Sequence, residues 1–428
     1  MKQYSVDLTH LCLYILILAT IIPDIGIKIS VHGFTWTFFR ICIVAGLLIL
    51  IMCDKGVLHI YQGTYSYAWI ILMLFWLFYG AVLLVTSSYS DKHNGILELL
   101  SVFNGMLLIY ALTSVEITEE IQSRMCGLII ILLFLLLALA GFEILTGKHL
   151  WMSYFNDASN QSVKEVLQRH AATGIMYNVN DFSALITCML PFCFYHGKRI
   201  VYCFCTILVF AVNTINDATL CNLAIIFGGL LYFIILRGQN IKKAIIRIIV
   251  CVISLIGIAL TGNILITLLS GRVNIIDRII LQINNARIGG GSLYRRFIMY
   301  KDLIAVARSS MFLGIGPASL TSYFTRFASK SRLVNPHCLL LEILSQYGIL
   351  VFAGFVILLT GMLITAIKCY METDDKNERS RYFVAAELII VYIMASFAPS
   401  SFIGYAYQWL IIAMICILLP KETKNKTQ

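Results

Sequence analysis

The chain has 428 residues, of which 60% are hydrophobic and 13% are charged, and it carries a net charge of +10. This composition excludes an ordinary soluble domain, in which about half of the residues are apolar. Together with a mean hydropathy of +0.86, it predicts an all-α polytopic membrane protein.

Apolar stretches long enough to cross roughly 30 Å of hydrocarbon follow one another along the chain. They begin near residues 8, 34, 66, 94, 125, 180, 200, 218, 244, 337, 382 and 401. We therefore expect about twelve transmembrane helices in a single integral membrane domain, residues 1–428. The first stretch has no small-residue cleavage site behind it, which predicts a retained helix.

The lysine and arginine residues in the connections predict the orientation. If the N-terminus is in the cytoplasm, most of the lysine and arginine residues that lie outside residues 270–336 are on the cytoplasmic side. We therefore expect a multi-pass protein with both termini in the cytoplasm. Two long connections then lie outside, a smaller extracytoplasmic loop of residues 147–178 and a large basic one of residues 270–336.

The large loop is rich in arginine. Its basic residues are Arg272, Arg278, Arg287, Arg295, Arg296, Lys301, Arg308, Arg326, Lys330 and Arg332. Two carboxylates, Asp277 and Asp302, oppose them. Export of such a loop is permitted because loops longer than about 60 residues escape the charge rule. A cationic basin at the outer membrane surface predicts a partner that carries phosphate.

Within this loop, residues 293–308 predict an amphipathic helix at the membrane interface. At about 100° per residue, its apolar arc consists of Leu293, Phe297, Tyr300, Leu303, Ile304 and Ala307. Arg295 and Asp302 lie opposite, whereas Arg296 falls inside the apolar arc. Two interpretations remain open for Arg296. It either snorkels to lipid headgroups or points into a cavity between this helix and the transmembrane bundle.

Three stretches occur in order between residues 165 and 355. Residues 169–191 read RHAATGIMYNVNDFSALITCMLP, residues 296–316 read RFIMYKDLIAVARSSMFLGIG, and residues 335–348 read NPHCLLLEILSQYG. The first stretch has an Asn-x-Asn before a helix that ends in Leu-Pro. The second has an arginine with an aromatic residue four positions later and a closing Gly-x-Gly. The third has an Asn-Pro-His that opens a helix. Together they resemble the O-antigen ligase and polymerase superfamily of bacterial envelope proteins.

The chain departs from the pattern of that superfamily at three places. Cys338 stands where the family usually has asparagine, and Gln346 stands where it usually has glutamate. The turn of residues 216–219 reads Asn-Asp-Ala-Thr where many members have Ser-Arg. These departures favour the more variable polymerase branch slightly over the ligase branch.

The resemblance implies a glycosyltransferase of the bacterial cytoplasmic membrane. No CxxC pair or Cys/His cluster in the sequence has the spacing of a zinc site, so we expect no metal, and we expect no cofactor. Our first hypothesis is a polymerase that joins undecaprenyl-pyrophosphate-linked oligosaccharide repeat units into a surface polysaccharide. The alternatives are a ligase that transfers a lipid-linked glycan to a different acceptor, and a transporter or flippase for such a glycan. The implied partners are the lipid-linked donor, a glycan acceptor, membrane lipids and a chain-length regulator, without nucleic acid.

The catalytic candidates are His337 and Arg296. His337 lies behind Asn335 and Pro336 at the start of a helix, where it is either a general base for the acceptor hydroxyl or a ligand of the pyrophosphate. Arg296 would stabilise the charge that develops on the leaving pyrophosphate. Guanidinium groups suit phosphate oxygens, so Arg169 and Arg295 are candidates for substrate binding.

The remaining candidates for substrate binding are less basic. Asn178 and Asn180 are candidates for sugar hydroxyl groups, whereas Asp181 is expected to cap the helix that follows. Tyr300 lies one turn from Arg296 and joins the same predicted site. Glu342 lies about one turn beyond His337, so it either orients the imidazole or pairs with an arginine.

Overall fold

The computed structural model describes most of the chain. The described residues are 2–23, 28–31, 34–53, 60–61, 63–89, 91–151, 153, 155, 170–235, 291–327 and 335–420. Parts of both predicted loops lie outside the described residues. They are residues 152, 154 and 156–169 of the smaller loop, which include Arg169, and residues 270–290 and 328–334 of the large loop.

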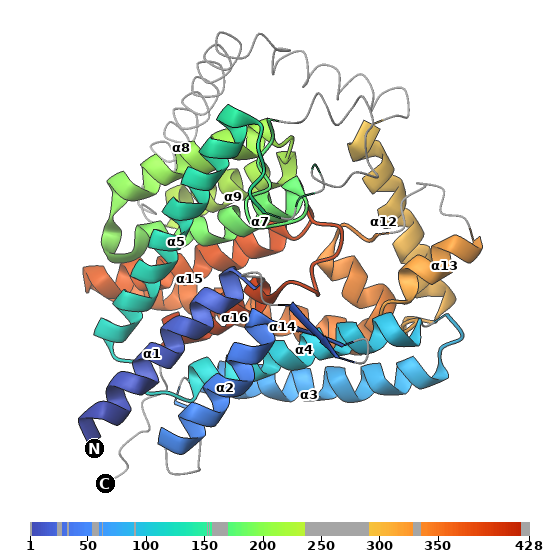
Figure 1. Ribbon diagram of the computed structural model, residues 1–428, viewed down its shortest axis with the longest axis horizontal. Helices are drawn as coiled ribbons and strands as arrows, with labels where there is room; N and C mark the ends of the chain where they lie inside the picture. The colour runs from blue at the N-terminus through green and yellow to red at the C-terminus, as the bar shows by residue number, and fades with distance from the viewer. Residues whose placement is uncertain are drawn as a thin grey trace.

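Helices dominate the described residues (Figure 1). The first group is α1 (Lys2–Ile21), α2 (Phe38–Cys53), α3 (Gly63–Thr86), α4 (Lys92–Thr113) and α5 (Glu119–Thr146). The second group is α7 (Val179–Met189), the 3-10 helix η3 (Leu190–Gly197), α8 (Arg199–Ile215), α9 (Thr219–Ile235), α12 (Gly291–Ser309), α13 (Ser319–Phe327), α14 (Leu339–Glu372), α15 (Lys376–Ala395) and α16 (Ala406–Leu418).

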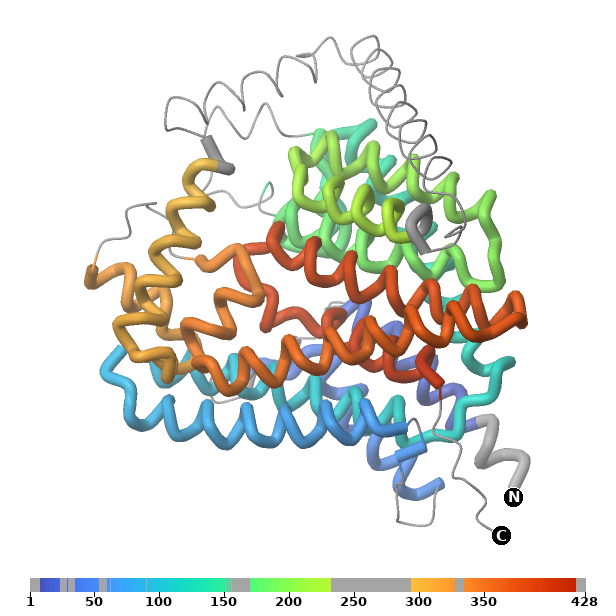
Figure 2. Tube along the Cα trace, turned by 180° about the vertical axis from the view of Figure 1, so that it is seen from behind, coloured from blue at the N-terminus to red at the C-terminus, as the bar shows by residue number. Residues whose placement is uncertain are grey.

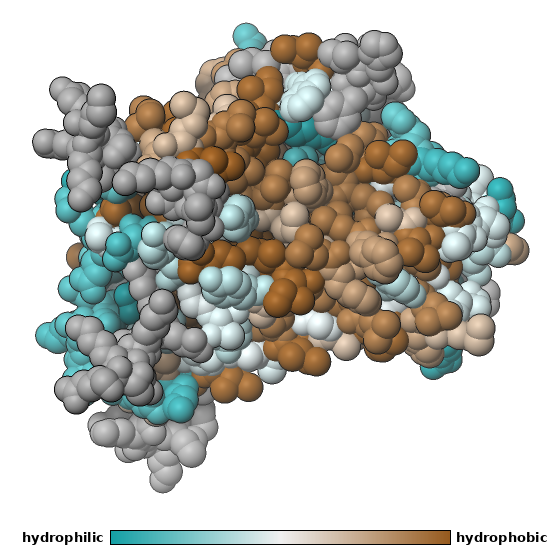
Figure 3. Space-filling view, turned by 90° about the horizontal axis from the view of Figure 1, so that it is seen from below, coloured by the Kyte–Doolittle hydropathy of each residue, from teal (hydrophilic) through white to brown (hydrophobic). Residues whose placement is uncertain are grey.

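A helix lies at each predicted apolar stretch except the one near residue 244, which falls outside the described residues. Four helices, α3, α4, α5 and α14, are long and apolar enough to cross a membrane, and several shorter apolar helices accompany them. Figure 3 shows an apolar surface between hydrophilic surfaces at the two ends of the molecule. This pattern is typical of a multi-pass membrane protein.

The structure is all-α, as predicted, and a short hairpin accompanies the helices. Two strands, β1 (Lys28–Val31) and β2 (Phe34–Thr37), pair as an antiparallel hairpin in which Ile29 lies opposite Trp36. β-branched and aromatic residues on both sides of a two-residue link favour such a hairpin. The second helix consequently begins at Phe38 and not near residue 34.

The predicted interfacial helix is present as α12, but its buried face differs from the prediction. Leu303 and Ala307 are buried as expected, and Met299 and Val306 are buried with them. Phe297, assigned to the apolar arc, is 55% exposed. The buried face follows the contacts of α12 with α13 and α14, where Met299, Leu303 and Val306 form a small separate core with Ile315, Leu320 and Phe324.

The two ends of the bundle differ in what they hold. Figures 1 and 2 both place the start of α1 and the end of α16 at one end, and α12 and α13 at the other. The turn between α3 and α4 lies at the same end as α12. This arrangement brings α12, α13, the first turn of α14 and the start of α4 together.

Candidate functional site

The loop that joins α15 to α16 is the centre of the candidate site. Arg296 on α12 donates from Nη1 to the carbonyl oxygen of Phe397 at 2.9 Å and from Nη2 to that of Ala398 at 3.4 Å. The guanidinium is therefore turned toward the bundle and not toward lipid headgroups. Of the two interpretations left open for Arg296, the geometry supports the inward one.

His337 binds the next two carbonyl groups of the same loop. Its backbone N–H donates to Ser400 O at 3.0 Å, and its Nδ1 lies 3.0 Å from Pro399 O. A carbonyl oxygen can only accept a hydrogen bond, so Nδ1 carries the proton and the lone pair is on Nε2. The backbone of His337 has a φ of +48°, a left-handed conformation that costs a non-glycine residue about 1–2 kcal/mol.

Burial and, as the second cause, the positive charge of Arg296 lower the pKa of His337 from its ordinary value of 6.5 to about 4. The imidazole is therefore neutral at neutral pH. Burial also lowers the pKa of Arg296 from its ordinary value of 12.5, but guanidinium groups stay protonated in proteins. The site thus pairs a fixed cation with a neutral base.

Tyr300 connects α12 to the same segment. Its hydroxyl group donates to the carbonyl oxygen of His337 at 3.1 Å, and its ring meets that of Phe397 edge-on with centroids 6.0 Å apart. Burial raises the pKa of Tyr300, so the hydroxyl keeps its proton and remains a donor. Tyr300 therefore holds the backbone of His337 in position, and its role here is positional.

Glu342 has neither of its two expected partners. Its carboxylate accepts hydrogen bonds from the hydroxyl group of Ser401 and, at 3.2 Å, from the backbone N–H of Phe402. The expectation that it orients His337 or pairs with an arginine is wrong, because it reaches the next two residues of the same loop. Residues 397–402 thus hold Arg296, His337 and Glu342 in consecutive positions.

A pocket of about 190 Å³ lies beside Asn335 and Pro336. Its walls come from the start of α4, the region of α13, the first turns of α14 and the α15–α16 loop. The lining residues are Asp91, Asn94, Glu98, Ala318, Leu320, Thr321, Ser322, Asn335, Pro336, Glu342, Gln346 and Ser401. We call this the polar pocket.

Glu98 is the part of this region that sequence analysis missed. It accepts hydrogen bonds from the hydroxyl group of Tyr347 at 2.5 Å and from Nε2 of Gln346 at 3.2 Å. A carboxylate inside an apolar stretch is itself a signal of function, and that signal was present in the sequence. Gln346, one of the departures from the family pattern, is the residue that binds it.

The glycines of the second and third motifs lock the two motifs together. Ile315 and Gly316 donate their backbone N–H groups to Ser345 O and Gln346 O, at 3.0 and 2.9 Å. A Cβ atom on Gly314 would lie 2.5 Å from Gln346 O, and one on Gly348 would lie 2.6 Å from Leu313 O. Gly348 also has a φ of +75°. Only glycine permits this approach without strain.

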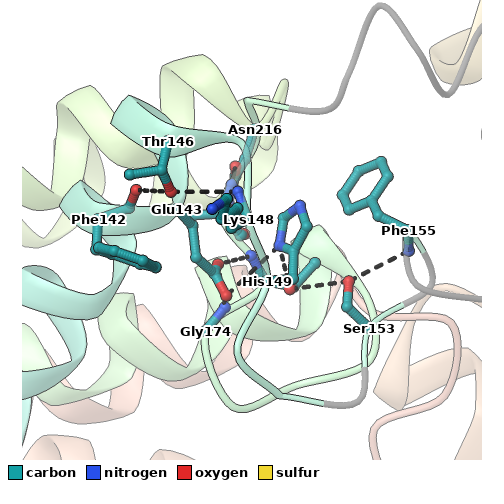
Figure 4. Close-up of polar contacts among 11 residues, drawn as sticks. Phe142, Glu143, Thr146, Lys148, His149, Ser153, Phe155, Gly174 and Asn216 are labelled. Atoms are coloured by element: carbon teal, nitrogen blue, oxygen red, sulfur yellow. Dashed lines mark hydrogen bonds and ion pairs between the residues drawn. The ribbon is translucent and has the colours of Figure 1, made fainter.

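The smaller loop is held by a separate polar cluster at the end of α5 (Figure 4). The carboxylate of Glu143 accepts from the backbone N–H groups of Thr173 and Gly174, both at 2.8 Å, and Nδ1 of His149 lies 3.5 Å from it. Asn216 bonds both the N–H and the carbonyl oxygen of Ala172 at 2.8 Å. This cluster fixes the backbone that leads into α7.

Three of the other predicted residues, Arg295, Asn178 and Asn180, are among the described residues. Arg295 is exposed on α12, and Arg169 lies outside the described residues. Asn178, and not Asp181, is the N-cap of α7, because its side chain accepts from the N–H of Asn180. Asp181 is instead buried in the first turn of that helix. Asn178 and Asn180 therefore serve the helix start.

Residues 185–356 match the family model described as O-antigen ligase. The matched segment runs from α7 into α14 and includes Arg296, His337 and Glu342. No curated protein matches the chain. Through residues 185–356, the chain carries an O-antigen ligase family domain, which confirms the resemblance of its motifs, and this family acts on lipid-linked glycans.

Proposed function

We propose that this protein is an integral membrane glycosyltransferase that polymerises undecaprenyl-pyrophosphate-linked oligosaccharide repeat units. The observation that carries the proposal is the placement of Arg296 and His337 on consecutive carbonyl groups of residues 397–400. A fixed cation and a neutral base next to each other are what the transfer of a glycan from a pyrophosphate to a hydroxyl group requires.

Arg296 is assigned to the leaving pyrophosphate. Two of its five N–H donors bind Phe397 and Ala398, which leaves the others for phosphate oxygens. The two carbonyl groups hold the guanidinium plane in place before the substrate arrives. Such preorganised charge stabilises the additional negative charge that appears on the pyrophosphate as its bond to the sugar breaks.

His337 is assigned to the acceptor. Its Nδ1–H is held by Pro399 O, so Nε2 is available to accept the proton of the acceptor hydroxyl. The oxygen of that hydroxyl then forms a bond to the anomeric carbon, and the bond between this carbon and the pyrophosphate oxygen breaks. The electron pair leaves with undecaprenyl pyrophosphate. A pKa of about 4 favours this role over that of a cationic pyrophosphate ligand, which would require a protonated imidazole.

The expected orientation agrees with this assignment. The distribution of lysine and arginine predicts both termini in the cytoplasm, and α12 and α13 lie at the opposite end of the bundle (Figure 1). Arg296 and His337 would then face the outside, where a polymerase meets exported lipid-linked units. A cysteine introduced at the exposed Thr325 of α13 should react with a membrane-impermeant maleimide added to intact cells in which the outer membrane is permeable.

A ligase is the second candidate, because the matched family model is described as O-antigen ligase. Both candidates use the same donor chemistry and differ in the acceptor.

The test is a transfer assay with the purified full-length protein in lipid nanodiscs. The substrate is the lipid-linked material that accumulates in a strain without the gene. A polymerase should convert it into a ladder of longer lipid-linked glycans. A ligase should produce a single transfer onto a different acceptor and no ladder. The proposal is refuted if neither product forms and the deletion strain accumulates its repeat units on the inner leaflet, as a flippase defect would cause.

A further inference from the structure

We propose that the polar pocket binds a sugar ring of the acceptor glycan and selects rings that carry no negative charge. This inference rests on the proposed function, because it places the acceptor in the same site. The pocket lies next to His337, since Asn335 and Pro336 form part of its wall. Ser401, another wall residue, follows the Ser400 that binds the backbone of His337.

The size of the pocket suits a ring and not only a solvent molecule. Its volume is about 190 Å³, several times the roughly 30 Å³ that one water molecule occupies in the liquid. Its wall alternates hydroxyl, amide and carboxylate groups, which can hydrogen-bond the hydroxyl groups of a sugar as both donors and acceptors. A glycan acceptor must present such hydroxyl groups.

Gln346 supplies a polar atom that points to a ligand. The residue is 2% exposed and lines the pocket. Its Nε2 donates to Glu98, which fixes the orientation of the amide. The Oε1 atom of the same amide can accept a hydrogen bond from a sugar hydroxyl group that enters the pocket.

The charge of the pocket decides which ligand can enter. Three acidic residues, Asp91, Glu98 and Glu342, line it, and the wall residues that the structure describes include no lysine or arginine. Glu342 is held by Ser401 and Phe402, which are neutral donors. Two neighbouring carboxyl groups disfavour any further negative charge beside them, so the pyrophosphate of the donor is directed to Arg296. The same repulsion disfavours a uronic acid as the acceptor ring.

An aromatic cluster beside the pocket adds a second feature of sugar recognition. The rings of Tyr89 and Tyr323 have centroids 5.1 Å apart, and the ring of Phe327 lies 4.7 Å from that of Tyr323. Tyr323 follows the pocket residue Ser322 on α13, and Phe327 is 57% exposed. Aromatic rings at the edge of a polar pocket can pack against the apolar face of a sugar ring.

The probes for the test are methyl glycosides of glucose, galactose and mannose, each as the neutral sugar, the 2-amino sugar and the uronic acid. Binding to the full-length protein in nanodiscs is measured at pH 7 by saturation-transfer NMR. We expect at least one neutral or amino glycoside to bind, and its uronic counterpart to bind at least about tenfold more weakly. Equal binding of the uronic acid, or no binding by any glycoside, would overturn the inference.

Two tryptophan variants of α13 locate the binding. Thr321→Trp places a large side chain in the pocket wall, and Thr325→Trp places the same side chain one turn away at an exposed position. Thr321→Trp should abolish glycoside binding, and Thr325→Trp should leave it unchanged. Glu98→Gln should reduce the difference in binding affinity between the neutral and the uronic glycosides. Binding that survives Thr321→Trp places the sugar elsewhere and contradicts the inference.

The transfer assay, run on the same preparations, separates this inference from the proposed function. Glycoside binding without any glycan transfer would refute the glycosyltransferase and leave the pocket assignment standing. Transfer that continues at the normal rate in Thr321→Trp would refute the pocket assignment alone. An increase in the concentration of acceptor needed for half-maximal rate, with an unchanged donor requirement, supports both.

Discussion

Residues 335–338 separate two regions of opposite charge. One side holds Arg296 and the imidazole of His337, bound to carbonyl groups 397–400. The other side holds the polar pocket with Glu98 and Glu342, and no cation is among the wall residues that the structure describes. The same loop serves both sides, because its next two residues bind Glu342. A transferase with an anionic donor and an uncharged acceptor ring benefits from such a division, since the pyrophosphate of the donor is attracted to Arg296 and repelled from the place of the acceptor.

The largest effect is expected at His337. His337→Ala should lower the rate of glycan transfer by about 10²–10⁴-fold, because that is the usual contribution of a general base. The measurement is kcat with lipid-linked substrate, compared with the thermal stability of the same preparation. A loss of rate without a loss of stability places the effect in the chemical step.

The pH dependence of the wild-type rate tests whether His337 acts as a neutral base or as a cationic ligand of the pyrophosphate. The pKa of His337 is about 4, below its ordinary value, so the neutral base predominates at every pH above that value. The rate should therefore be level between about pH 6 and pH 8 and should fall only toward pH 4. A rate that decreases from pH 5 to pH 7 would instead mean that the protonated imidazole is required, as a ligand of the pyrophosphate.

Arg296 should have the next largest effect. Arg296→Lys keeps the charge but loses the planar fork that binds the two carbonyl groups, and we expect kcat to fall by roughly 10²–10³-fold. Arg308→Ala is the matched control, because Arg308 lies on the same helix and is exposed. Comparable losses in both variants would show that the loss is not specific to the position of Arg296, which contradicts its assignment.

Much of the fold follows from the sequence. In the membrane, an apolar stretch must satisfy its backbone N–H and C=O groups internally, and a helix does so. The buried face of α12 does not follow from its periodicity, since Phe297 is exposed and Met299 is buried. An interfacial helix has apolar surroundings on two sides, lipid and protein, and the hydrophobic pattern does not distinguish them.

The candidate site was predictable only where side chains carry it. Arg296 and His337 stood out as charged or titratable groups in motifs. The part played by the loop of residues 397–402 could not be predicted, because this loop contributes mostly backbone carbonyl groups. Every residue has such a group, so no side-chain pattern identifies those that take part. Glu98 is different, because a lone carboxylate in the apolar stretch of α4 is visible in the sequence. Its partner Gln346 lies 248 positions away, and only the fold brings them together.

Gly348 lies where the backbones of the second and third motifs meet, so its replacement should reduce stability. Gly348→Ala introduces a Cβ atom 2.6 Å from Leu313 O at a φ of +75°, and we expect a loss of about 2 kcal/mol or more. Gly141→Ala is the control, because a Cβ atom there meets nothing within 4 Å. On α5 it should be neutral or stabilising by up to about 1 kcal/mol. Equal effects on thermal unfolding would contradict the proposed lock between the motifs.

The smallest effect concerns the amide that separates this chain from the family pattern. Gln346→Glu replaces the donor to Glu98 with a second carboxylate, and the loss of the 3.2 Å hydrogen bond should cost about 1–3 kcal/mol. The double variant Glu98→Gln/Gln346→Glu restores one amide and one carboxylate with their positions exchanged. If Glu98 and Gln346 act as a pair, the double variant should recover stability and the selection against uronic glycosides. Additive losses of stability and of selectivity would show that the two residues act independently. The charge of the polar pocket would then depend on where its carboxylates lie and not only on their number.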